Sequence, residues 1–188
     1  MDIATYFTDH WINIEDDRVE RYERMFQWRE SQLEQLAPAS IETGHHILDF
    51  GCGPGFFALA LADIVGKQGR VYGADINERF ISDATRRADD RENISFHHLT
   101  DHVLPFQAAS LDRVLAKNVL EYVPDVTLTL DEMYRVLLPG GRIHVLDSDW
   151  GFVLVEPWGK ATADRFFDAA SVAFKEPHIG RKLVQLLK

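Results

Sequence analysis

The stretch ILDFGCGPG, residues 47–55, joins a short apolar run to a longer one and decides the fold. His46–Phe50 predicts a buried strand, and Phe56–Val65 has the length and apolar character of a buried helix. Between them, glycines occupy alternate positions 51, 53 and 55. Glycine permits sharp turns and close approach of a ligand to the backbone, and the first turn of the following helix has free N–H groups. The stretch therefore predicts a strand, a ligand-binding loop and a helix.

Strands and helices continue to alternate after this loop. Further strands are predicted at 70–76, 93–99, 111–116 and 142–146, and helices at 78–90, 124–138, 159–174 and 179–188. This alternation is typical of βαβ units, which build a mostly parallel sheet covered by helices on both faces. We therefore predict an α/β protein with a Rossmann-like, doubly wound sheet. Ligands of such sheets bind beyond the carboxyl ends of the strands.

The first 40 residues differ from the rest. Residues 1–14 read as irregular chain and residues 15–36 as one long charged helix, with Pro38 just past its end. We interpret residues 1–40 as an N-terminal helical extension, or lid, on a domain formed by residues 41–188. Its aromatic side chains would cover a ligand or seal the core, and Tyr6 and Trp11 fit the lid role best. These aromatic residues are Tyr6, Phe7, Trp11, Tyr22, Phe26 and Trp28.

The composition is that of an acidic globular domain, with 46% apolar residues, 27% charged residues and a net charge of −10. An acidic chain lacks the basic face that binds nucleic-acid backbones, so we expect no nucleic-acid partner. No stretch approaches the ~20 apolar residues of a membrane span, and the first fifteen residues lack the pattern of a secretory signal. The single cysteine, Cys52, cannot form an intrachain disulfide, and we expect a cytoplasmic protein.

Two acidic residues near the glycine loop narrow the class of ligand. The spacing G-x-G-x-G differs from the dinucleotide pattern G-x-G-x-x-G, because Phe56 stands at the third glycine position. Asp49 precedes the first glycine by two residues, where a negative charge suits a cofactor with a positive ammonium and sulfonium better than a pyrophosphate. Asp75 ends the second predicted strand, where an acid accepts hydrogen bonds from ribose hydroxyls. An aspartate at this point also suits a turn or the cap of the next helix.

Five segments occur in the order and spacing of a known family. They are ILDFGCGPG (47–55), VYGADIN (71–77), LTDHVLPF (99–106), LDRVLAKNVLEYVPD (111–125) and LLPGGRIHVLDSDW (137–150). Together they resemble class I S-adenosylmethionine-dependent methyltransferases, in particular the methyltransferase type 11 and ubiquinone/menaquinone-biosynthesis group. The resemblance implies S-adenosylmethionine as the cofactor. It says little about the methyl acceptor, which we expect to be a small molecule.

The resemblance also implies a role for each matching position. Asp49 and the backbone at Gly51 and Gly53 would hold the methionine part of the cofactor. Asp75 would bind the ribose, and Ile76 would pack on the adenine. The remaining positions would meet the adenine amino group, through Asp101 with Thr100 or His102 nearby, and border the methionine part, through the Lys117 backbone and the Asn118 side chain.

Two departures from the family pattern matter. Tyr122 stands where family members often carry histidine, so a role of that histidine does not transfer unchanged. The family sheet has seven strands, the last two antiparallel, and we predict the last two to be absent here, through truncation or in a short variant. In either case an exposed sheet edge is expected, which favours pairing with another chain, such as a dimer.

Other chemistry-bearing residues have more ordinary explanations. Cys52 is a candidate reactive thiol at a helix N-terminus, but we favour a small residue that fills a tight turn. The histidines lack the helical spacing of a zinc site and have no cysteine pair beside them, so we expect no metal. Asp147 and Asp149 follow the fifth strand at the ligand-binding end, where either one orients or deprotonates an acceptor or both serve in a solvated loop.

The leading hypothesis is therefore in-line methyl transfer from S-adenosylmethionine. A base is needed only if the acceptor keeps its proton at neutral pH, and the candidates are His10, Tyr122, Asp147 and Asp149. The alternatives are a non-catalytic S-adenosylmethionine-binding partner subunit and a nicotinamide-dependent oxidoreductase. The glycine spacing and Asp49 argue against the oxidoreductase.

Overall fold

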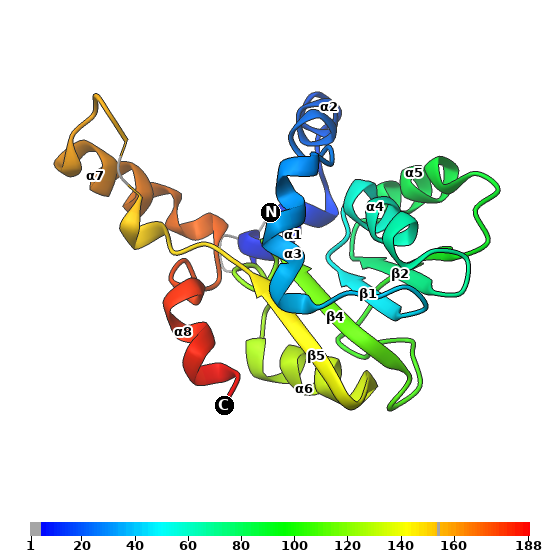
Figure 1. The fold of residues 1–188 in the computed structure, drawn as a ribbon. Helices are drawn as coiled ribbons and strands as arrows, with labels where there is room; N and C mark the ends of the chain where they lie inside the picture. The colour runs from blue at the N-terminus through cyan, green and yellow to red at the C-terminus, as the bar shows by residue number, and fades with distance from the viewer. Residues whose placement is uncertain (1–4, 154) are drawn as a thin grey trace.

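A single parallel sheet organises the protein (Figure 1). The structure, a computed structural model, describes residues 5–153 and 155–188. All four neighbouring strand pairs are parallel, in the order β3-β2-β1-β4-β5. The predicted α/β class and doubly wound parallel sheet are confirmed. The strands are β1 (His46–Phe50), β2 (Arg70–Asp75), β3 (Ile94–His98), β4 (Leu111–Lys117) and β5 (Leu137–Leu146).

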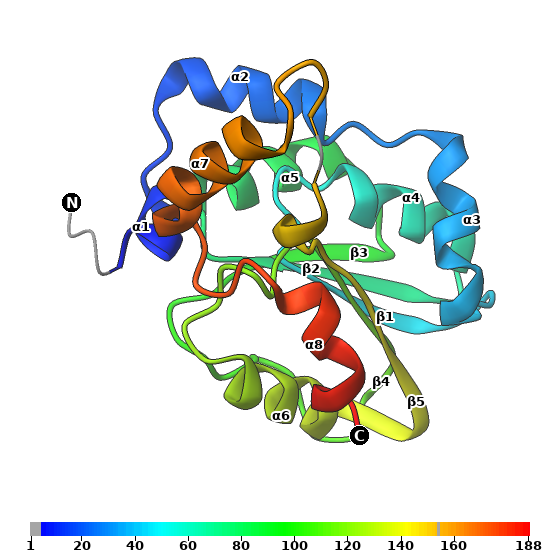
Figure 2. The ribbon, with the colours of Figure 1, turned by 90° about the vertical axis from the view of Figure 1, so that its left-hand side faces the viewer.

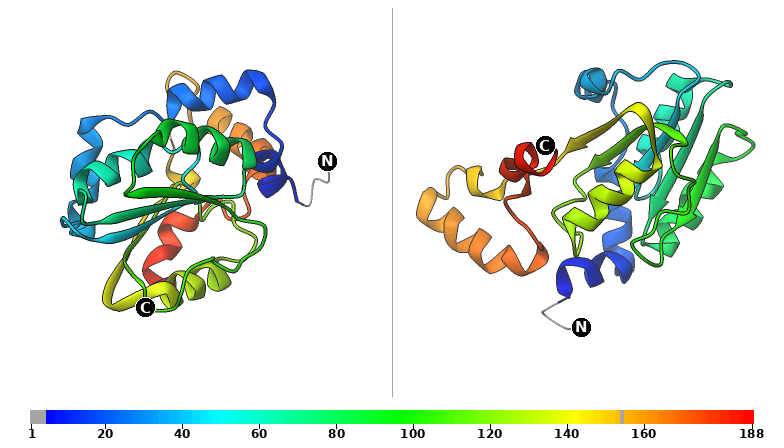
Figure 3. Two further views of the ribbon diagram at one scale, coloured as in Figure 1. Left: turned by 90° about the vertical axis from the view of Figure 1, so that its right-hand side faces the viewer. Right: turned by 90° about the horizontal axis from the view of Figure 1, so that it is seen from below.

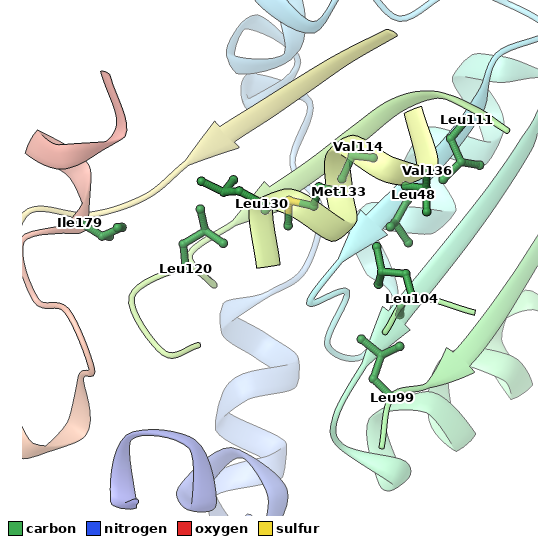
Figure 4. Close-up of a cluster of buried hydrophobic side chains, with 12 residues drawn as sticks. Leu48, Leu99, Leu104, Leu111, Val114, Leu120, Leu130, Met133, Val136 and Ile179 are labelled. Atoms are coloured by element: carbon green, nitrogen blue, oxygen red, sulfur yellow. The ribbon is translucent and has the colours of Figure 1, made fainter. Parts of the chain in front are cut away.

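Helices cover both faces of the sheet (Figure 2). α4 (Phe56–Val65) and α5 (Glu78–Ala88) pack on one face, and α6 (Val126–Val136) packs on the other. Successive strand residues point to opposite faces. Ile47 accordingly belongs to the core cluster under α4 and its neighbour Leu48 to the cluster under α6, which Figure 4 shows. Both residues are fully buried.

The N-terminal prediction needs two corrections. Residues 5–14 are not irregular, because they contain α1 (Tyr6–Ile12). The predicted single helix over residues 15–36 is instead α2 (Asp16–Met25), a 3-10 turn at Glu30–Gln32 and α3 (Leu33–Leu36). The break lets Trp28 stack on the ring of Phe57, with ring centroids 5.6 Å apart. Contacts between distant segments therefore decided the course of this part of the chain.

The other predicted elements are confirmed with shifted boundaries. α6 begins at Val126, because the Asp125 side chain caps it by accepting from the Leu128 N–H, so Pro124 stays outside the helix. β5 starts at Leu137, earlier than predicted. Its register with β4 jumps from Leu111 opposite Leu137 to Arg113 opposite Arg142, and Gly140, in the skipped stretch of β5, has a φ of 85°.

The C-terminal part folds into helices beside the sheet (Figure 3). It contains a 3-10 turn at Trp150–Phe152, α7 (Lys160–Ala170), a second 3-10 turn at Ser171–Ala173 and α8 (Ile179–Leu186). Ile179 is 1% exposed and joins the core cluster under α6. In the segments that the structure describes, no helix is both long and apolar enough to cross a membrane.

Candidate functional site

A pocket lies at the carboxyl ends of β1, β2 and β4, where the strand order reverses. We call this cavity of about 200 Å³ the strand-end pocket. The glycine loop, the N-terminal segment and the loop after β4 complete its lining. The lining residues are Thr8, Trp11, Met25, Phe26, Gln32, Asp49, Phe50, Gly51, Cys52, Gly53, Pro54, Phe56, Phe57, Asp75, Ile76, Phe80, Leu99, Lys117, Asn118, Val119, Tyr122, Val123 and Pro124.

The glycines of the loop 51–55 are needed for two different reasons. All three adopt positive φ angles, of 73° at Gly51, 52° at Gly53 and 86° at Gly55. A Cβ at Gly51 would collide with the side chain of Val119, and a Cβ at Gly55 would lie 2.6 Å from that of Ala84. At Gly53 a Cβ would meet only the Phe26 ring, at 4.0 Å. Packing therefore requires Gly51 and Gly55, whereas Gly53 leaves room for a ligand beside the backbone.

Asp49 brings a buried carboxyl group to the strand-end pocket. The residue is 2% exposed, and its Oδ2 has no hydrogen-bond partner among the described residues. Burial, followed by the nearby charge of Asp75, raises the pKa of Asp49 to about 8, while Lys117 acts in the opposite direction. A buried carboxylate without a partner is costly, and an adjacent cation relieves that cost. The environment of Asp49 is therefore suited to a positively charged ligand group.

Asp75 holds the glycine loop in place. Its Oδ2 accepts from the Gly53 N–H and its Oδ1 from the Asn77 N–H, both at 2.8 Å. Burial raises the pKa of Asp75, although these backbone bonds act against the rise. An ionised carboxylate has about four acceptor sites, so Asp75 retains capacity to accept from ligand hydroxyls.

Asn77 supports the strand-end pocket from outside its lining, a role that the sequence did not reveal. It is 4% exposed and caps α5 by accepting from the Phe80 N–H, so the capping role considered for Asp75 belongs to Asn77. Its Nδ2 donates to the Trp11 carbonyl at 2.6 Å, which fastens α1 beside the pocket. An asparagine before the predicted helix signalled the cap. The contact with Trp11 spans 66 positions and had no local signal.

Three of the five remaining cofactor candidates lie in the pocket lining. They are Ile76, Lys117 and Asn118, and Asn118 adopts a left-handed conformation with φ of 54°. Thr100 and Asp101 are exposed and lie outside the lining. The Asp101 Oδ1 accepts from the Val103 N–H at 2.8 Å. Beyond β3, the residue that lines the pocket is the buried Leu99.

His10 and Tyr122 lie together at the wall formed by the N-terminal segment. Tyr122 lines the pocket, and its ring centroid is 5.8 Å from His10 and 5.0 Å from Trp11. Burial lowers the pKa of His10, and its Nδ1 lies 2.5 Å from the Tyr6 carbonyl oxygen. Burial also raises the pKa of Tyr122, so its phenol stays protonated at neutral pH. His10 itself lies behind the lining residues Trp11 and Tyr122.

Of the two aromatic residues predicted to fit a lid best, only Trp11 reaches the pocket. Tyr6 stacks on His10 with ring centroids 5.0 Å apart and is outside the lining. Phe26, which follows α2, does line the pocket. Thr8 ties α1 to the loop after β4, because its Oγ1 donates to the Tyr122 carbonyl at 2.9 Å.

Comparison with known proteins identifies the family. A family model described as "Methyltransferase domain" matches residues 41–178. The chain belongs to this methyltransferase family.

Curated relatives and solved structures agree with this assignment. Demethylmenaquinone methyltransferase of Geobacillus sp. (strain WCH70) is 31% identical over 129 residues, which cover 68% of this chain and 54% of the relative. The enzyme of the same name from Shouchella clausii (strain KSM-K16) is 36% identical over 123 residues, which cover 64% of this chain and 51% of the relative. The chain therefore spans about half the length of these curated relatives.

Structural similarity covers more of the chain. Phosphoethanolamine N-methyltransferase 2 of Haemonchus contortus, solved in complex with S-adenosyl-L-methionine, aligns with a TM-score of 0.77 and 18% identity. The alignment covers 96% of this chain and 43% of that structure. A SAM-dependent methyltransferase from Aquifex aeolicus aligns with a TM-score of 0.64 and 20% identity, covering 77% of this chain and 79% of that structure. At these identities the likeness shows that the methyltransferase fold is shared.

Asp147 and Asp149 of the methyltransferase domain lie outside the strand-end pocket, so the geometry does not support them as bases. Asp147 accepts from the N–H groups of Val119 and Leu120, at 3.2 and 2.8 Å, and so fixes the loop after β4. Asp149 pairs with Arg181 and lies 3.1 Å from the Nδ1 of His178. The hydrogen bonds from Arg181 lower the pKa of Asp149. Both carboxyl groups already serve the protein's own backbone and side chains.

Glu121 is a buried acid that the sequence reasoning did not single out. It is 1% exposed, its carboxylate accepts from the Trp150 indole N–H, and burial raises the pKa of Glu121 to about 7. Its carbonyl accepts from the N–H groups of Lys175 and Glu176, at 2.9 and 3.1 Å. Glu121 therefore fastens the C-terminal segment of the methyltransferase domain to the loop that carries Tyr122. In the sequence, only its position next to Tyr122 in the segment 111–125 pointed to Glu121.

The surroundings of Cys52 and the grouping of the histidines bear on whether they form reactive or metal-binding sites. Cys52 is buried, and burial raises the pKa of its thiol, which disfavours the reactive thiolate and agrees with a residue that fills a turn. Within residues 5–153 and 155–188, no three His, Cys, Asp or Glu side chains are grouped closely enough to hold a metal ion.

Proposed function

We propose that this protein binds S-adenosylmethionine in the strand-end pocket and transfers its methyl group to a small-molecule acceptor. The observation that carries the proposal is Asp49, a buried carboxyl group at a pocket with an acceptor oxygen that no described residue uses. The cofactor's ammonium group would supply the missing donor and the compensating charge. Membership of the methyltransferase family supports the same cofactor.

The cofactor would lie along the strand ends. Asp49 would bind the ammonium group, and the backbone at Gly51 and Gly53 would border the methionine part, where Gly53 has open space beside it. Asp75 would accept from the ribose hydroxyls while it keeps its bonds to the loop. Lys117 and Asn118 would complete the methionine end, and Ile76 would pack against the adenine.

The proposed contact of Thr100 and Asp101 with the adenine needs a local rearrangement. Both are exposed and outside the pocket lining, so contact with the adenine amino group would require the loop after β3 to move inward. Leu99 is already in the lining and offers an apolar surface to the same end of the cofactor.

The protein's contribution to methyl transfer is alignment and exclusion of water. The bound cofactor supplies an electrophilic methyl group on a sulfonium. Holding the acceptor in line with that methyl accounts for ~7–11 kcal/mol of barrier lowering in well-oriented systems. We propose residues 1–40 as the lid, of which the structure describes 5–40, and Trp11 and Phe26 line the pocket from that side.

Two of the base candidates remain next to the pocket. His10 is kept neutral by burial and would accept a proton through the ring nitrogen that does not face Tyr6. The raised pKa of Tyr122 keeps its phenol protonated, and the phenol would donate to the acceptor after it releases its side-chain hydrogen bond with Glu121. An acceptor that is already nucleophilic at neutral pH would need neither residue as a base.

The acceptor is proposed to be a small, largely apolar molecule. The curated relatives are named as demethylmenaquinone methyltransferases, and aromatic and aliphatic residues such as Trp11, Met25 and Phe26 line the side of the pocket away from the strands. The acidic composition argues against a nucleic-acid acceptor. We further infer a cytoplasmic setting from the single cysteine and a dimer through the outer edge of β5.

Calorimetry tests the cofactor assignment. S-adenosylhomocysteine should bind with roughly micromolar affinity, and Asp75→Ala should abolish binding because both ribose acceptance and loop anchoring are lost. NADH should not bind. Binding of NADH in place of S-adenosylhomocysteine would overturn the assignment in favour of an oxidoreductase.

A methyl-transfer assay separates an enzyme from a non-catalytic binding subunit. Radiolabelled S-adenosylmethionine would be incubated with the protein and panels of small molecules, proteins and RNA. Transfer to a small apolar nucleophile is the expected result. Tight cofactor binding without transfer to any member of the panels would favour the partner-subunit alternative.

A further inference from the structure

Two ion pairs join α2 to α5 at the side of the strand-end pocket. Asp16 and Glu23 of α2 pair with Arg79 and Arg87 of α5, respectively. The two acids lie about two helical turns apart on α2, and so do the two arginines on α5. Figures 2 and 3 show α2 lying above α5 at the same end of the sheet. Two matched pairs in register make a clamp between the helices.

The two pairs differ in their surroundings. Asp16 and Arg79 are largely in solvent, with side chains 93% and 50% exposed, so their mutual attraction is heavily screened. Glu23 and Arg87 are 31% and 27% exposed. The Glu23–Arg87 pair is the less screened of the two and carries most of the electrostatic contact between α2 and α5.

Arg87 contacts the glycine loop with the same guanidinium. Its Nη1 donates to the Pro54 carbonyl at 3.0 Å, while its Nη2 pairs with Glu23. Its carbon Cζ also lies 4.7 Å from the ring centroid of Phe56, the first residue of α4. One side chain therefore binds the helix above the pocket and the loop that forms its base.

We propose that Arg87 is a positioning residue that couples closure of α2 to the geometry of the glycine loop, and that the Glu23–Arg87 pair controls the rate at which the cofactor leaves. This inference rests on the proposed function. Met25 and Phe26, at the end of α2, line the pocket, and in this proposal α2 moves away when a bound cofactor exchanges. That movement breaks the Glu23–Arg87 pair and frees one arm of the guanidinium that holds Pro54.

The fork geometry of arginine is required for this coupling. The two contacts of Arg87 use two different nitrogens of one planar group. A lysine at this position would keep the charge but present a single compact ammonium, which favours one partner over the other. Glu23→Gln removes the charge of the pair with little change in shape and leaves the Pro54 contact in place.

The dissociation rate of S-adenosylhomocysteine tests the proposal. Surface plasmon resonance on the immobilised full chain would measure it at about 0.05 and 0.5 M NaCl, since the Debye length shrinks from above to well below 10 Å over that range. The wild-type rate should rise about two- to fivefold with salt, as expected for one partly exposed ion pair. Glu23→Gln should dissociate at the fast rate at both salt concentrations.

Asp63→Asn is the matched control. It removes the ion pair between Asp63 of α4 and Arg91, which follows α5. That pair involves neither α2 nor the glycine loop, so this variant should keep the wild-type dissociation rate and its salt response. Arg87→Lys should give an intermediate rate, and Arg87→Gln should also weaken equilibrium binding because the Pro54 contact is lost.

Hydrogen exchange of residues 16–25 provides a second measurement. Glu23→Gln should increase exchange in α2 by about two- to fivefold, while the melting temperatures of Glu23→Gln and Asp63→Asn stay alike. If Glu23→Gln releases S-adenosylhomocysteine at the wild-type rate with the wild-type salt response, the coupling is refuted and the proposed function stands. If the wild type does not bind S-adenosylhomocysteine, the proposed function is refuted, and the coupling is refuted with it.

Discussion

The ends of β1 and β5 both carry buried or partly buried aspartates, but their surroundings are opposite. The Oδ2 of Asp49, at the end of β1, has no partner among the described residues, and burial raises its pKa to about 8. Asp149, after β5, is bonded by Arg181 and the Gly151 N–H and lies beside His178, and Arg181 lowers its pKa. An acid whose acceptor capacity is used up supports the fold, whereas one with unused capacity at a pocket is suited to a ligand.

The comparison extends to a second pair of acids, one at the end of β2 and one after β5. Asp75 and Asp147 both accept backbone N–H groups from loops at the sheet's carboxyl edge. Only Asp75 lines the strand-end pocket. In the sequence the two acids look alike, because each is an aspartate at or just after the end of a strand. Only their contacts in the folded protein separate an acid suited to a ligand from a structural one.

The largest effect is expected from replacing the acid that lacks a partner. Asp49→Asn should weaken S-adenosylhomocysteine binding by about 30- to 100-fold, because a charge-assisted hydrogen bond to the ammonium is lost. Calorimetry would measure the affinity. Asp149→Asn is the control and should bind like the wild type, and an equal loss in both variants would remove the distinction between the two regions.

The pH dependence of binding should sharpen the same distinction. The pKa of Asp49 is about 8 in the unliganded protein, and only the ionised carboxylate pairs with an ammonium. The affinity for S-adenosylhomocysteine should therefore rise from pH 6 to pH 8, by about tenfold per unit well below the pKa. Calorimetry at three pH values would show the rise, and it should be nearly absent in Asp49→Asn.

The unliganded protein should show the opposite trend in stability. A carboxyl group whose folded-state pKa is raised binds its proton more tightly in the folded state than in the unfolded state. The contribution of Asp49 to the free energy of unfolding should thus fall as pH rises from about 4 to 8. Urea unfolding should find Asp49→Asn more stable than the wild type at pH 8, and a less stable variant would contradict the account of Asp49.

Asp147→Ala should lower the free energy of unfolding more than it weakens cofactor binding. The N–H groups of Val119, Leu120 and Ser148 would lose their acceptor, and unpaired N–H groups in a partly buried loop cost about 2 kcal/mol in total. Urea unfolding would measure the loss. A variant that keeps wild-type stability but loses methyl transfer would restore Asp147 as a catalytic candidate.

The smallest effect is expected at the ion pair of the C-terminal segment. Asp149→Asn should loosen α8 by weakening its tie to Arg181, and hydrogen exchange of residues 179–186 should rise about two- to fivefold. Asp164→Asn, which removes the exposed pair with Lys160, is the control. Unchanged exchange in Asp149→Asn would mean that Ile179, buried under α6, holds the helix without help from the ion pair.

Much of the sheet could be predicted because its signals are local. The apolar runs 46–50 and 56–65 predicted β1 and α4 with the bounds that the structure shows. The N-terminal segment could not be predicted in the same way. α1 is held by Asn77 and by the carbonyl of Tyr122, both far away in the chain, and α2 ends where Trp28 turns toward Phe57.

The sequence by itself determined the parallel α/β fold, the glycine loop and the positions of Asp49 and Asp75, because strand periodicity and the positive φ angles at Gly51, Gly53 and Gly55 act over a few residues. Only the tertiary structure decided which acid has an unused acceptor, which aromatic residue reaches the pocket and which arginine joins α2 to the loop. Those properties depend on burial and on hydrogen bonds between distant segments, as between Asp149 and Arg181. Such contacts exist only once the chain has folded.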